Sequence, residues 1–220
     1  MPDFVTRADL RREMDALIRS PAFSSTMTPA GVAGRNVSTP EVADLPPAPQ
    51  HGDEILFNVS DATCFWNLRF NQFLNPPYQW VMLGGAAMRA TKADSDTFTS
   101  SSYADGSPVG PTLTVPLAGI YSVRWGARMA HDTGGGFGYM TIKIGSATTT
   151  DADGLLFQTA ANFNQMSSFS KNFTVPAPRT VVKAQYKNGS GVGNFTLHNA
   201  DAADNAEAFI EITPIFVGRV

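Results

Sequence analysis

Hydrophobic and polar residues alternate along most of the chain after residue 50, as they do in β-strands with one buried face. Residues 54–59, 64–70 and 78–83 form three such segments, and Gly84-Gly85 ends this group. Further strand-like segments then recur at roughly the 8–12-residue spacing of all-β sandwiches and barrels. They cover residues 96–103, 111–116, 119–130, 137–145, 154–160, 167–175, 179–188, 193–198 and 206–217. Pro214 in the last segment predicts a bulge or an edge position in a strand that should otherwise lie centrally in its sheet.

The first twenty residues have a helical period instead. Thr6 is a suitable N-cap, and Ser20-Pro21 ends the pattern because the residue before proline avoids the α region. One apolar stripe runs along the predicted helix: Leu10, Met14, Leu17 and Ile18. A helix of about four turns is marginal alone in water, so the stripe must pack on its own domain or on other chains. We expect these four residues to attach the chain to an assembly.

Residues 21–50 are rich in Ser, Thr, Gly and Pro, which predicts an extended or partly disordered arm that makes no core. The predicted fold is therefore mostly β and has four parts. These are a short helix in 1–20, a Pro-rich linker in 21–50, a small three-stranded meander in 51–86 and a jelly-roll-like β-sandwich in 87–220.

Only 16% of the 220 residues are charged and the net charge is −3, so there is no basic excess to bind a nucleic acid. Low charge with many small polar residues is common in secreted and virion β-proteins. No stretch approaches 18 apolar residues, which argues against membrane insertion. Charged residues interrupt the apolar ones near the N-terminus, so we expect no signal peptide and synthesis in the cytoplasm.

Residues with catalytic or metal-binding chemistry are scattered. His51, His131 and His198 lie far apart without metal-ligand spacing, and we expect no cofactor. His131-Asp132 could form a catalytic pair, but a solvated loop is the favoured interpretation. We therefore expect no enzymatic activity.

Two further patterns have a structural and a functional interpretation. The run from Asp151 to Gly154 resembles a fragment of a calcium loop without the full spacing or the closing Glu, so a turn explains it and Ca²⁺ binding stays open. Cys64 is the single cysteine, which excludes an intrachain disulfide and favours a small core residue.

Large aromatic residues crowd into residues 65–80, where Trp66, Tyr78 and Trp80 could face a ligand. Such rings could stack on the faces of sugars. Alternatively, a thin three-stranded unit needs large rings to build a core, and we favour this second interpretation.

Two stretches resemble known families. Trp66-Asn67-Leu68-Arg69-Phe70, followed by Tyr78-Gln79-Trp80-Val81-Met82-Leu83-Gly84-Gly85, resembles the W-x-L-R-Y … Y-x-W-x-x-V-G-G pattern of minor tail proteins of actinobacterial phages. Residues 113–123, which read LTVPLAGIYSV, are similar to the entry strand of C1q/TNF-like jelly rolls and phage fibre heads. The chain ends in FVGRV, where the C1q/TNF group has a Phe-Gly signature.

The resemblance implies a virion component at the tail tip, baseplate or tail fibre that forms a homotrimer. Its partners would be copies of itself, other tail or capsid proteins and a host-surface glycan. A capsid decoration or head-fibre protein has the same layout and is one alternative. A carbohydrate-binding module or carbohydrate-active enzyme is another, and an enzyme would need paired carboxylates in a cleft.

Overall fold

The computed structural model describes residues 36–37, 45–60, 64–107, 109–158, 160–161, 164–190, 192–197 and 208–220. The predicted N-terminal helix in 1–20 and most of the linker lie outside these residues. The described strands are β1 (Asn36–Val37), β2 (Glu54–Ser60), β3 (Cys64–Phe70), β4 (Trp80–Gly85), β5 (Met88–Lys92), β6 (Asp96–Phe98), β7 (Thr112–Val115), β8 (Ala118–His131), β9 (Phe137–Ile144), β10 (Leu155–Gln158), β11 (Gln165–Val175), β12 (Thr180–Asn188), β13 (Phe195–Leu197) and β14 (Ala208–Gly218). A short 3-10 helix, Asp151–Asp153, precedes β10.

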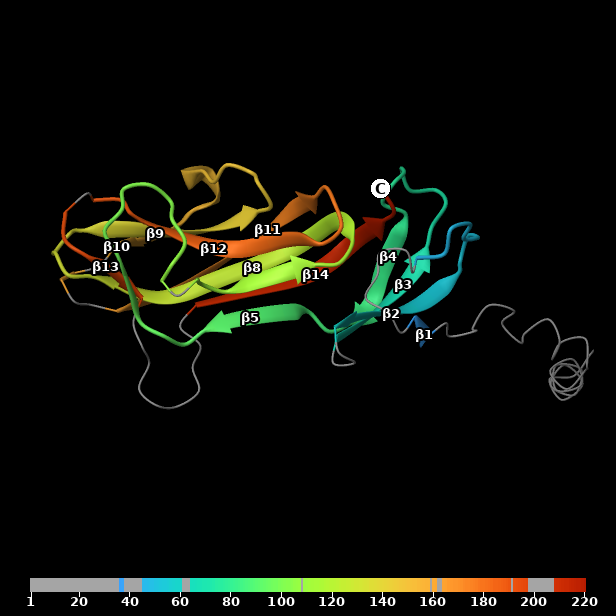
Figure 1. Ribbon diagram of the computed structural model, residues 1–220, viewed down its shortest axis with the longest axis horizontal. Coiled ribbons are helices and arrows are strands. Elements are labelled where there is room, and N and C mark those ends of the chain that lie inside the picture. The colour runs from blue at the N-terminus through green and yellow to red at the C-terminus, as the bar shows by residue number, and fades with distance from the viewer. Residues whose placement is uncertain are drawn as a thin grey trace, which may run out of the picture.

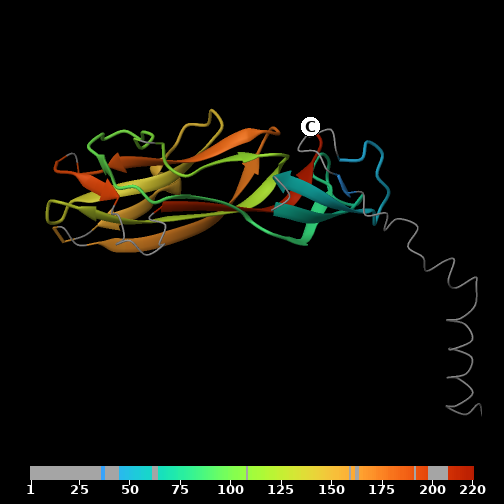
Figure 2. The ribbon, with the colours of Figure 1, turned by 60° about the horizontal axis from the view of Figure 1, so that its bottom comes forward.

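These strands form two sheets that pack as a β-sandwich, which confirms the predicted fold class for the described residues (Figure 1). The larger sheet has the order β1-β2-β3-β4-β14-β8-β13-β6, with β11 on the other edge of β8 and β5 on β14. The smaller sheet has the order β10-β9-β12-β7. Figure 2 shows the two layers side-on, with the β2–β4 meander continuing the long axis at one end.

Strands β8 and β14 lie at the centre of the larger sheet. Alternate residues of β8 point inward, and Tyr121, Val123 and Trp125 are fully buried between the sheets. β14 pairs antiparallel with β8 along nearly its whole length, with a register shift between Pro214 and Phe216. The predicted central position of the last strand and the bulge near Pro214 are therefore confirmed.

The β2–β4 meander and the sandwich share one hydrophobic core. The end of β14 pairs with β4, so the meander continues the larger sheet. Trp66 of β3 contacts Phe57 and, at 6.1 Å between ring centroids, Tyr121 of β8. The aromatic rings of the meander thus pack against the sandwich as well as against each other.

The end of the predicted linker also enters this core. Leu45 is fully buried, and Arg219 Nη1 donates a 3.3 Å hydrogen bond to its carbonyl oxygen. β1 pairs in parallel with β2, with Asn36 opposite Leu56. The expectation that residues 21–50 make no core was wrong at Leu45, because the proline-rich composition concealed one apolar anchor.

The sequence pattern did not predict β5. Gly84-Gly85 looked like the end of the meander, but the chain continues into a strand that pairs with residues 208–212 of β14. β6 ends at Phe98 rather than at residue 103, and the following loop runs along the edge of β12, where Ala104 and Tyr186 form an isolated bridge.

Candidate binding cavity

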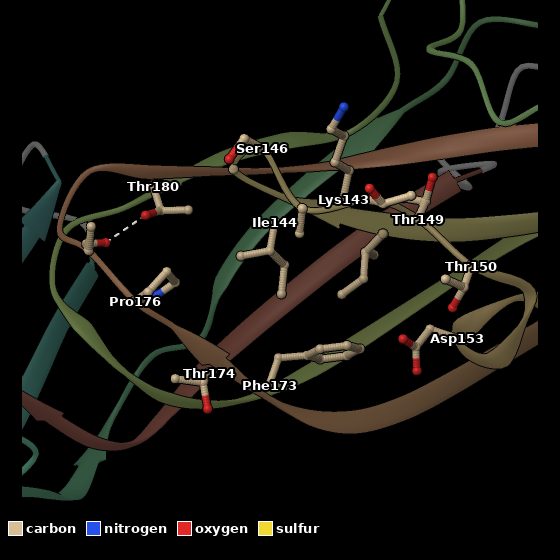
Figure 3. A pocket seen from close by; sticks show the side chains of 15 residues that line it. Lys143, Ile144, Ser146, Thr149, Thr150, Asp153, Phe173, Thr174, Pro176 and Thr180 are labelled. Atoms are coloured by element: carbon tan, nitrogen blue, oxygen red, sulfur yellow. Dashed lines mark hydrogen bonds between the residues drawn. The ribbon is translucent and has the colours of Figure 1, made fainter.

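A cavity of about 520 Å³ opens at one edge of the sandwich, where the end of β9 and the end of β11 diverge. Its walls come from the loop after β9, the turn between β11 and β12, and β11 itself (Figure 3). The lining residues are Ile142, Lys143, Ile144, Gly145, Ser146, Ala147, Thr148, Thr149, Thr150, Asp153, Phe173, Thr174, Pro176, Ala177 and Thr180. This volume lies within the roughly 300–1,000 Å³ range of small-molecule sites.

The floor of the cavity is apolar. Ile142 and Ile144 are alternate residues of β9, so both point from the smaller sheet toward the space between the layers. Phe173 reaches the same space from β11, and its ring packs on Trp125 at 5.8 Å between centroids. Figure 3 shows the Ile144 and Phe173 side chains directed toward one another across the cavity.

One end of the cavity is polar. Asp153 and Thr150 lie there beside the Phe173 ring (Figure 3). Lys171, an exposed residue of β11 that borders this end without lining the cavity, forms an ion pair with Asp153 Oδ1, and its Nζ lies 5.4 Å from the Phe173 ring centroid. Asp153 Oδ2 has no hydrogen-bond partner among the described residues. The Asp153 backbone is fixed because its carbonyl oxygen accepts a 3.0 Å bond from Thr141 Oγ1.

Hydrogen bonds hold the cavity walls in place. Gly145 adopts a φ of 56° and its N–H donates to Val181 O at 2.8 Å, which turns the chain sharply at the end of β9. Thr149 Oγ1 donates to Gln185 Oε1 at 3.1 Å. On the opposite side, Thr180 Oγ1 donates to Ala177 O at 2.6 Å. The cavity is therefore bounded by anchored segments.

The two carboxylates of the short 3-10 helix point to different environments. Asp153 lines the cavity, whereas Asp151 lies on the outer side and accepts bonds of 2.5 and 2.7 Å from Lys187 Nζ. The Lys187 bond lowers the pKa of Asp151. Because each carboxylate pairs with a lysine, the arrangement offers no shared site for Ca²⁺. The described residues contain no group of three or more His, Cys, Asp or Glu side chains that could hold a metal ion.

The aromatic residues that could have faced a ligand lie mainly in the core. Trp66 and Trp80 are 0% and 3% exposed, and Trp66 Nε1 donates to Ala86 O at 3.0 Å. Tyr78 is half-buried in the loop just before β4. The ligand-facing interpretation was therefore wrong for both tryptophans, because the meander uses them to pack on the sandwich. The predicted attachment residues Leu10, Met14, Leu17 and Ile18 lie outside the described residues.

His131 is buried rather than solvated, so the interpretation of a solvated loop was wrong at this residue. Its Nδ1 accepts a 3.1 Å hydrogen bond from the backbone N–H of Thr133 and lies 3.6 Å from Asp132 Oδ1. Its Nε2 lies 2.9 Å from Ser190 Oγ and 3.3 Å from Asn188 Oδ1. Asp132 also accepts bonds of 2.8 and 2.7 Å from Asn194, and the first of these lowers its pKa.

The cavity could not be found from the sequence pattern. The pattern predicts a strand at residues 137–145 and a turn at residues 151–154, but no site that they share. Phe173 is about thirty residues from Ile142 and Ile144, and only the pairing of β11 with β8 places it beside them. The alternation of side chains along β9 and β11 is the signal in the sequence that Ile142, Ile144 and Phe173 all face inward.

No family model matches the chain, and no curated protein matches it. Solved structures that resemble it include the insecticidal delta-endotoxin Cry8Ea1 of Bacillus thuringiensis, with 22% identity and a TM-score of 0.33 over 56% of this chain. The match spans only 20% of the toxin chain.

Two other similar structures differ widely in size. The C-terminal CBM6 of LamC from Zobellia galactanivorans is 12% identical with a TM-score of 0.27, over 58% of this chain and 99% of that one. A structure of the Gx strain of infectious bursal disease virus is 13% identical with a TM-score of 0.29, over 74% and 45% of the two chains.

None of the described helical segments has the length and apolar character needed to cross a membrane.

Proposed function

We propose that this chain is a structural protein of a phage virion, placed at the tail tip, the baseplate or a tail fibre. Its N-terminal segment attaches to the particle, and its β-sandwich projects and contacts the host surface. The resemblance of the Trp66–Gly85 region to minor tail proteins motivates this proposal. The proposed mechanism is binding, with no catalytic step.

The layout of the described strands is the observation that best supports the proposal. β1, next to the N-terminal segment, lies on β2 at one end of an elongated molecule (Figure 1). β13 and the outer end of β8, which carry the loop 132–136 and residues 189–190 and 192–194, lie at the other end (Figure 1). An attachment segment at one end and loops at the other suit a protein that is held by the particle and reaches outward.

Deleting residues 1–35 tests the attachment role. The deletion leaves Leu45 in place, because this residue is fully buried and its loss would also weaken the core. We expect the shortened chain to fold but to be missing from assembled particles. Replacing Leu17 on the apolar stripe with aspartate should lower incorporation, whereas the same change at Arg11, off the stripe, should not. Incorporation of the shortened chain at the wild-type level would contradict the proposal.

We also propose that the chain is a homotrimer in the particle. Light scattering of the purified chain tests this directly, because one chain has a mass of 23.5 kDa. A solution mass near three chains supports the proposal. A monomer at all concentrations contradicts a preformed trimer and favours the alternative of a decoration protein that is ordered by its neighbours.

A carbohydrate-binding module is a second candidate function, and the cavity between β9 and β11 is the observation that favours it. This function is compatible with the first, because a tail protein can contact the host by binding a surface glycan.

A further inference from the structure

We propose that the cavity between β9 and β11 binds a neutral pyranose ring of a glycan. The inference rests on the proposed function and gives it a site: this edge of the sandwich, rather than the aromatic residues of the meander, makes the contact with sugar.

The cavity requires a ligand with an apolar face. Ile142, Ile144 and Phe173 form a continuous apolar floor between the sheets. A small inorganic ion or a fully polar ligand would find no partner on this floor. The C–H face of a sugar ring is apolar and would exclude water from this floor. The aromatic ring of Phe173 is a good surface for such a contact.

The cavity also requires a ligand with hydroxyl groups. Asp153 Oδ2 can accept a hydrogen bond, and Lys171 Nζ, which pairs with Asp153 Oδ1, has further protons to donate. The Thr150 hydroxyl lies beside the Asp153 carboxylate (Figure 3). A wholly apolar ligand would cover these groups and leave them unsatisfied, which is unfavourable. Adjacent hydroxyls of a pyranose can accept from the ammonium and donate to the carboxylate at once.

Charge favours a neutral sugar over an acidic one. Asp153 and Lys171 neutralise each other, and the ammonium of Lys143, another charged lining residue, points away from the cavity (Figure 3), so the polar end has no net charge. Asp153 would also repel a carboxylate or sulfate placed within hydrogen-bond distance. The anchored walls around Thr149 and Thr180 mean that little ordering is needed when the ligand binds.

Saturation-transfer difference NMR of the full chain tests the proposal. The probes are the methyl glycosides of glucose, galactose, mannose and N-acetylglucosamine. We expect the ring C–H protons of at least one glycoside to receive saturation from the protein. Affinity for that glycoside should fall at least tenfold in Asp153→Asn and in Phe173→Leu.

The chain provides a matched control for each variant. Asp151 belongs to the same 3-10 helix as Asp153 but pairs with Lys187 outside the cavity. Phe169 belongs to the same strand as Phe173 and also packs on Trp125, at 5.2 Å, but does not line the cavity. Asp151→Asn and Phe169→Leu should therefore bind the glycoside as the wild type does.

Three results would overturn the proposal: no saturation transfer to any of the four glycosides, binding that is unchanged in both cavity variants, or equal loss in the control variants. None of these results bears on whether the chain is part of a particle. Conversely, a chain that is absent from particles but binds a glycoside through this cavity would remove the proposed virion role and leave the sugar site standing.

Discussion

Replacing Trp66 with alanine measures how far the meander depends on the core it shares with the sandwich. The indole is fully buried between Phe57 and Tyr121, and its Nε1 donates to Ala86 O. Truncating a buried aromatic residue costs about 3–5 kcal/mol of unfolding free energy. The carbonyl of Ala86 keeps a second donor, Cys64 Sγ at 3.4 Å, so no large further penalty is expected. We therefore expect a loss of about 4 kcal/mol.

Thermal and urea unfolding, followed by circular dichroism, give this value. In a chain of this size a loss of about 4 kcal/mol lowers Tm by roughly 8–16 °C. Phe73 is 77% exposed, so Phe73→Ala is a control that should change stability by less than about 0.5 kcal/mol. A Trp66→Ala variant as stable as the wild type would refute the conclusion that Trp66 is a core residue, and weaker glycan binding in that variant would restore its ligand-facing role.

Other perturbations test separate parts of the structure. Leu45→Ala should lower the free energy of unfolding, measured in urea, by about 2–5 kcal/mol. If residue 45 lay in a linker outside the core, the substitution would leave the stability unchanged. Gly218→Ala places a methyl group against the carbonyl oxygen of Pro77 at the end of β14, and it should lower the free energy of unfolding by about 1–3 kcal/mol. An unchanged midpoint of urea unfolding would contradict this packing. The hydrogen bond from Lys183 lowers the pKa of Asp105 in the folded chain. Ionised Asp105 therefore stabilises the fold at pH values above about 3.9, which is the pKa of an aspartate in an unfolded chain. The Tm advantage of the wild type over Asp105→Asn should therefore be present at pH 7 and shrink as pH falls below about 4. An advantage that does not change with pH would contradict this ion pair.

The alternation of apolar and polar residues predicted most of the fold, because a strand that is buried on one face has apolar residues at every second position of its sequence. The strands at residues 54–60, 64–70 and 118–131 lie close to their predicted positions for this reason. The bulge at Pro214 was also predictable, because proline lacks the N–H that the ladder needs.

The pattern failed where structure depends on distant pairing. β5 exists because residues 88–92 pair with β14, about 120 positions later, and the preceding glycines concealed it. Leu45 was misassigned because the surrounding prolines dominate the local composition. The cavity was missed because alternation shows which face a residue occupies, but not whether the opposite sheet covers that face. Phe173 faces inward yet remains half-buried, since the smaller sheet diverges from β11 there.

Immunogold labelling of phage particles tests the central proposal most directly. Antibodies raised against residues 45–220 would be applied to particles assembled from the genome that encodes this chain. The account predicts label at the tail tip, the baseplate or the tail fibres. Label confined to the head would instead support the decoration or head-fibre alternative, and particles with no label at any position would contradict a virion role.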